Sequence, residues 1–76
     1  MFEIGAILTV EPKTIFAKKQ CRMYGLRWEV LAFDVGVVKA RAVDADSDFD
    51  IIRTIGTDGY DFKIVSSSAL VRHVEP

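Results

Sequence analysis

The sequence has little of what disulfide-linked, membrane-spanning and secreted proteins contain. Cys21 is its only cysteine, which excludes an internal disulfide framework and a metal site built from several thiolates. No window approaches the roughly 18 consecutive apolar residues of a membrane-spanning helix. The first residues also lack the basic start and long apolar run of a signal peptide. We therefore expect a cytoplasmic protein that does not enter a membrane.

Histidine is equally scarce. His73 is the only one, and the serines nearest to it are residues 66–68. A nucleophile, a base and an orienting acid must meet in space to act together, and no spacing in the sequence brings such a set together. The sequence therefore predicts no catalytic residue and no cofactor, and His73 is interpreted as a structural side chain.

The composition nevertheless predicts a folded chain. Its 76 residues are room for one domain, spanning residues 1–76. Half of the residues are hydrophobic and 11% are aromatic, whereas disordered segments are poor in both kinds.

The net charge of -1 conceals a segregation along the chain. Residues 12–28 hold five basic residues and no acidic one, and residues 29–61 hold eight acidic residues and three basic ones, which gives net charges of +5 and -5. If these blocks occupy different surfaces, the field can orient a charged partner or let one copy dock on another. The alternative is a solvated surface on which opposite charges meet within one chain.

Alternation of apolar and charged residues predicts half-buried strands at residues 37–43 and 60–65. Residues 6–10 form a shorter predicted strand that stops at Glu11 and Pro12, because proline gives no ladder hydrogen bond. The side chains predicted to face the core are Val38, Ala40, Ala42, Tyr60, Phe62 and Ile64.

A further strand is predicted at residues 28–33, which are apolar on both faces apart from Glu29. Such a strand is covered on both sides or used at an interface, so we expect a homo-oligomer at micromolar concentration. Gly36 can adopt the positive φ that a tight turn needs. Residues 28–43 are therefore predicted to form a β-hairpin.

Two segments remain open. Residues 12–24 form either a helix, with Pro12 at its first position and Gly25 after its end, or a long loop. Residues 48–55 form either a short helix or a strand. In the second case residues 56–59 make a hairpin loop into the next strand.

The end of the chain carries a resemblance to a known fold. Residues 61–74 read as a strand, a small polar turn, Ala69-Leu70 and a short last strand, and a first strand led by Gly5 and the hairpin at 28–43 precede them. This order resembles the Src-homology-3-like small barrels over most of the chain. The resemblance implies a mainly all-β fold, a five- to six-stranded barrel. The alternative is a β-α-β-β-α-β sandwich, if both open segments are helical.

Within that fold, the sequence is similar to the plasmid-encoded type II dihydrofolate reductases, which are tetramers with a site in a central pore. Their pore strand reads Val-Gln-Ile-Tyr, and the matching positions here are Phe62, Lys63, Ile64 and Val65, of which only the isoleucine is kept. This resemblance implies an oligomeric pore enzyme as an alternative function.

The basic segment carries the predicted binding residues. Cations and aromatic side chains alternate within it, and the residues expected to contact a partner are Lys18, Lys19, Arg22, Tyr24 and Trp28. We predict a non-catalytic module that binds a protein partner or a second copy of itself. The same residues could bind nucleic acid through phosphate contacts and stacking, but the isoelectric point near 5.7 favours a protein partner.

The acidic run is the weak candidate for a metal site. Its carboxylates alternate along the chain and are Asp44, Asp46, Asp48 and Asp50. Oxygen ligands at this density suit a divalent cation, but the run lacks the glycine and glutamate of an EF-hand in both registers. A charged edge that prevents sheet-to-sheet association explains the run more simply, so no metal site is predicted.

Overall fold

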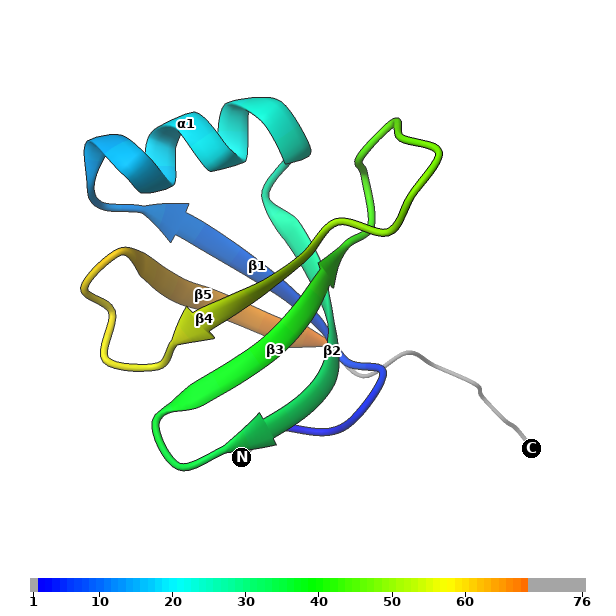
Figure 1. Ribbon diagram of the computed structural model, residues 1–76. Coiled ribbons are helices and arrows are strands. Elements are labelled where there is room, and N and C mark those ends of the chain that lie inside the picture. Colours follow the sequence, from blue (N-terminus) through cyan, green and yellow to red (C-terminus); the bar gives the residue numbers. More distant parts are fainter. Residues whose placement is uncertain (1, 69–76) are drawn as a thin grey trace.

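The computed structural model describes residues 2–68 of the chain (Figure 1). In chain order its elements are β1 (Ile7–Pro12), α1 (Ile15–Tyr24), β2 (Arg27–Asp34), β3 (Val37–Ala42), β4 (Ile52–Gly56) and β5 (Phe62–Ser68). Strand residues outnumber helical ones, which confirms the prediction of a mainly β fold.

All five strands belong to one antiparallel sheet in the order β4-β3-β2-β1-β5. The sheet is strongly curled, and α1 lies across one of its ends (Figure 1). β4 and β5 are the two edge strands and do not pair with each other. The sheet is therefore open over the described residues, and the prediction of a closed barrel is wrong.

Each edge strand pairs with one inner neighbour along its length. Every residue of β4 pairs with β3, and every residue of β5 except Val65 pairs with β1. Residues 66–68, predicted to be a polar turn, instead extend β5 alongside Ile7, Leu8 and Thr9. The last strand predicted after Ala69 lies outside the described residues.

The predicted hairpin is confirmed as β2 and β3. Asp34 and Val37 are the last paired residues, and Gly36 turns the chain with a φ of 76°. The Asp34 carboxylate accepts a hydrogen bond from the Val35 backbone N–H at 2.7 Å, which supports the turn. The register shifts between Val30 and Ala32.

One face of the curled sheet and one side of α1 form the core. Trp28 is its largest side chain and is fully buried, and its indole N–H has no hydrogen-bond acceptor among the described residues. Burial of each large side chain contributes about 1.5–3 kcal/mol. The core residues are Ala6, Leu8, Val10, Ala17, Cys21, Trp28, Val30, Val38, Ala40, Ile55 and Phe62. The alternation predicted for β3 is confirmed, because Val38 and Ala40 face this core.

The first open segment is a helix, but it begins later than the sequence predicted. Pro12 is the last residue of β1, opposite Phe62, rather than the first residue of a helix. Thr14 is the N-cap, and its side-chain oxygen accepts a hydrogen bond from the Ala17 N–H at 3.1 Å. Gly25, with a φ of 94°, ends the helix as predicted.

The second open segment is a strand, and only from Ile52 onward. Ile55 pairs with Val38 and is buried, as its β-branched side chain favours. The hairpin predicted between this strand and β5 is wrong, because residues 57–61 lead to the opposite edge of the sheet. Tyr60, predicted to face the core, lies in this connection and is exposed. Since residues 48–55 are not helical, the β-α-β-β-α-β sandwich is wrong as well.

Candidate functional site

The solvent side of α1 combines cations with exposed apolar side chains. We call this set the α1 outer face, and it consists of Ile15, Phe16, Lys18, Lys19, Arg22 and Met23. Ile15 is 86% exposed, and Phe16 and Met23 are more than half exposed. Within the described part of the chain, none of the three cations forms an ion pair.

The helix periodicity fixes which residues point outward. Ala17 and Cys21 lie four residues apart, so they share one side of α1, and both are buried against the sheet. Burial raises the pKa of the Cys21 thiol, so this residue is a core group rather than a reactive one. The α1 outer face consists of exposed residues on the rest of the helix circumference.

Two further contacts fix the helix on the sheet. The Thr14 hydroxyl donates a hydrogen bond to the Asp61 carboxylate at 2.8 Å, just before β5 begins. Toward the other end, Arg53 on β4 donates from its Nε to the Gln20 side-chain oxygen at 3.2 Å. The Arg53 guanidinium also lies 5.3 Å from the centre of the Tyr24 ring, in cation–π range.

The five predicted binding residues differ in position and in exposure. Lys18, Lys19 and Arg22 lie together on the α1 outer face. Tyr24 is half-buried beneath Arg53, at the margin of that face. Trp28 has no exposed surface, so it is a core residue and offers no contact area to a partner.

The acidic run forms the loop between β3 and β4, and we call residues 44–50 the acidic loop. At its start, Asp44 accepts two hydrogen bonds from the Arg27 guanidinium, at 2.7 and 3.0 Å. This pairing lowers the pKa of Asp44 and raises the pKa of Arg27. At its end, Asp50 lies 3.8 Å from the Arg41 guanidinium, which also forms an ion pair with Glu29.

The four carboxylates predicted as weak metal ligands do not converge. Asp44 and Asp50 are directed to different arginines, and Asp46 and Asp48 are exposed. Over residues 2–68, the structure places no group of three or more histidine, cysteine or acidic side chains where they could hold a metal ion.

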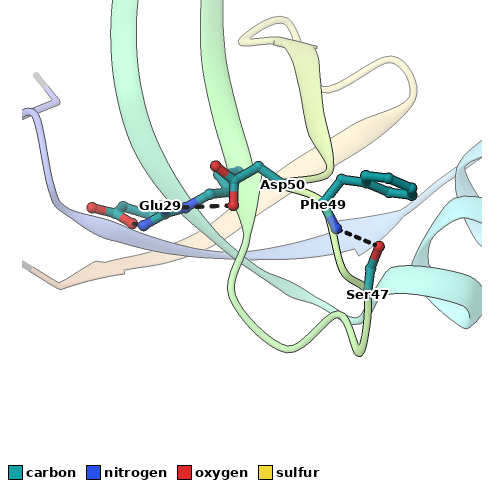
Figure 2. Close-up of polar contacts among 5 residues, drawn as sticks. Glu29, Ser47, Phe49 and Asp50 are labelled. Carbon is teal, nitrogen blue, oxygen red and sulfur yellow. Dashed lines mark hydrogen bonds and ion pairs between the residues drawn. The ribbon is translucent and has the colours of Figure 1, made fainter.

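Phe49 is the residue of this loop that sequence reasoning missed. Figure 2 shows Asp50 directed toward the ion pair at Glu29, while the Phe49 ring points away from both. The ring is 77% exposed, and the Phe49 N–H donates to the Ser47 hydroxyl oxygen at 3.2 Å. The signal in the sequence was one aromatic residue within a run of four aspartates.

Helix α1 and the acidic loop lie at the same end of the sheet (Figure 1). Gly25, which ends α1, lies so close to the loop that an added Cβ would come within 3.0 Å of the Asp44 Cβ. The end of α1 and the start of the acidic loop are therefore neighbours. Only Arg27 and Asp44 neutralise each other across their boundary in the described residues.

A shallow hollow of about 310 Å³ lies elsewhere, near the β2–β3 turn. Its lining residues are Ala32, Phe33, Asp34, Val37, Lys39 and Thr54. The positions that match the reductase pore strand lie on β5. There Phe62 is a core residue, Lys63 is exposed opposite Glu11, and Val65 lies at the register shift.

No helix among residues 2–68 has the length and apolar character needed to span a membrane. A comparison of the chain with protein-family models, with curated proteins and with solved structures gives no match.

Proposed function

We propose that this protein is a small non-catalytic binding module whose α1 outer face binds an acidic protein partner. The observation that carries the proposal is a set of three cations that form no ion pair with any residue the structure describes, set among three exposed apolar side chains on one helix.

Each kind of side chain has its own part in such binding. Lys18, Lys19 and Arg22 attract an acidic surface over a distance and raise the rate of encounter. Phe16 and Met23 then supply apolar area that is removed from water in the complex. The partner that fits both is an acidic segment with apolar side chains between its carboxylates.

Kinship with the Src-homology-3-like barrels is also a proposal. It is supported by the order of a first strand, a long connection, a hairpin and a late strand that returns to β1. The open edges at β4 and β5 are a departure from such a barrel.

The test uses a peptide of alternating glutamate and leucine as the probe, with an alternating glutamine and leucine peptide as its neutral control. We expect the Lys18→Glu, Lys19→Glu variant to bind the acidic peptide at least about tenfold more weakly than wild type. The matched control is Lys39→Glu, Lys63→Glu, which changes the net charge equally at exposed positions outside α1. Both variants should keep the wild-type stability to within about 1 kcal/mol, because exposed charges contribute little to folding.

Equal weakening by both variants would refute a role of this face. A single-stranded DNA oligomer that binds with a steep salt dependence, while the acidic peptide does not bind, would favour the nucleic-acid alternative. Binding of pterin or nicotinamide by a tetramer would favour the pore-enzyme alternative.

A further inference from the structure

The acidic loop is neutralised at its two ends but not in its middle. Asp44 is paired with Arg27, and Asp50 lies near Arg41. Between them, Asp46 and Asp48 are exposed and form no ion pair with any residue that the structure describes. The loop is therefore attached to the sheet by its ends and presents its free charges to solvent.

The middle of the loop complements the α1 outer face in both charge and polarity. It offers two carboxylates and the exposed ring of Phe49, directed away from the sheet-bound Asp50 (Figure 2). The α1 outer face offers cations flanked by Phe16 and Met23. Methionine and aromatic side chains both pack favourably on an aromatic ring.

The spacings of the charges also agree. Asp46 and Asp48 are two residues apart and therefore separated by at most about 7 Å along the chain. Lys18 and Arg22 are four residues apart on a helix, where the rise places them about 6 Å apart on one side. Two carboxylates of the loop can therefore meet two cations of the helix at once.

From this complementarity we infer that the protein forms a dimer in which the acidic loop of each copy docks on the α1 outer face of the other. The inference rests on the proposed function, because it identifies the acidic partner as a second copy of this chain. Helix α1 and the acidic loop lie at the same end of the sheet (Figure 1), so a two-fold axis there lets each copy give one loop and receive one. One short loop and one helix face per copy make a small interface, for which we expect micromolar affinity.

The experiment exchanges the charges of the two surfaces. The helix variant is Lys18→Glu, Arg22→Glu, and the loop variant is Asp46→Lys, Asp48→Lys. The mass in solution is measured by sedimentation at low salt and at about 100 μM protein, and circular dichroism checks that each variant is folded. We expect wild type to be a dimer and each variant alone to be a monomer, because each homodimer would bring like charges together.

The equimolar mixture of the two variants gives the strongest result. In a mixed dimer, the glutamates of the helix variant face the lysines of the loop variant, and the native helix of the second copy faces the native loop of the first. We therefore expect the mixture to regain the mass of a dimer. Association that persists in both variants alone, or a mixture that stays monomeric, would overturn the inference.

A second pair of variants tests the apolar part without a change of charge. Phe49→Ser should weaken the association at least about tenfold. The matched control, Phe33→Ser, removes an exposed aromatic side chain at the far end of the β2–β3 hairpin and should leave the association unchanged. Equal effects of the two substitutions would count against the docking of Phe49.

These outcomes separate the inference from the proposed function. If wild type is a monomer but binds the glutamate–leucine peptide through α1, the inference is wrong and the proposed function stands. If wild type is a monomer and the peptide does not bind, both are wrong.

Discussion

Thr14 is the residue whose substitution tests most directly how α1 is held. Its side-chain oxygen accepts the Ala17 N–H at 3.1 Å and donates to the Asp61 carboxylate at 2.8 Å. Its backbone carbonyl also accepts the first helical hydrogen bond, from Lys18 at 2.8 Å. One hydroxyl therefore both caps the helix and ties it to the residue that precedes β5.

We expect Thr14→Ala to lower the free energy of unfolding by about 2 kcal/mol. Loss of a threonine cap costs about 1 kcal/mol. Loss of a partly buried hydrogen bond to Asp61 costs about 1 kcal/mol more. In a domain of this size the melting temperature should fall by about 8–16 °C, since each kcal/mol corresponds to about 4–8 °C.

The assay is thermal and urea unfolding followed by the fluorescence of Trp28, the only tryptophan and a fully buried one. Thr14→Ser is the matched control, because it keeps the hydroxyl and should lose less than about 0.5 kcal/mol. Asp61→Ala, alone and combined with Thr14→Ala, separates the cap from the hydrogen bond through their coupling energy. The reasoning is refuted if Thr14→Ala melts within about 3 °C of wild type, or if the serine variant is equally damaged.

Two further predictions follow from the Asp44 ion pair and the β2–β3 turn. The Arg27 guanidinium lowers the pKa of Asp44, so this carboxylate stabilises the fold above its unfolded pKa of about 3.9 and loses that effect as the pH falls through its lower folded value. The stability gap between wild type and Asp44→Asn should therefore be larger at pH 7 than at pH about 2 in thermal melts. An equal gap at both pH values would contradict this assignment. Gly36→Ala should lower the free energy of unfolding by about 1–2 kcal/mol. The cause is backbone strain alone, since the φ of Gly36 is 76° and an added Cβ meets no atom within 4 Å. An unchanged midpoint of chemical denaturation would show that the turn relaxes.

Much of the sheet could be predicted from local pattern. The alternation around Val38 and Ala40 and the position of Gly36 predicted the β2–β3 hairpin because its two strands are neighbours in sequence. The same locality explains the end of α1 at Gly25, where one residue supplies the positive φ that stops a helix.

Pairing between distant segments could not be predicted in this way. Glycines at 56 and 59 indicate a turn, and a turn between two strands suggests a hairpin, yet β5 pairs with β1, which lies fifty or more residues earlier in the chain. That pairing also recruits residues 66–68 into the strand, although serine favours turns locally. Pro12 ends β1 for the same reason, because its position opposite Phe62 is set by the sheet rather than by its neighbours.

Some residues of the candidate site could likewise be predicted from local pattern, and others could not. Helix periodicity places Lys19 and Arg22 away from Ala17 and Cys21, and Lys18 lies at the flank, so these cations could be predicted as a solvent-facing group. Trp28 stands beside them in sequence but belongs to β2, where alternation directs it into the core. Phe49 could not be ranked as a surface residue from the sequence, since an aromatic side chain in a short acidic run is equally compatible with burial.

The order of the strands brings the basic segment and the acidic segment of the sequence to the same end of the sheet. β1, β2 and β3 are successive antiparallel neighbours, so the connections β1–β2 and β3–β4 leave the sheet at the same end. The first connection is the basic helix and the second is the acidic loop, and the Arg27–Asp44 pair marks their boundary. Had the two blocks lain at opposite ends, the same complementarity would have favoured head-to-tail chains without a limit. Because they are neighbours, the dimer that we propose would satisfy both surfaces with a two-fold pair of contacts and would close at two copies.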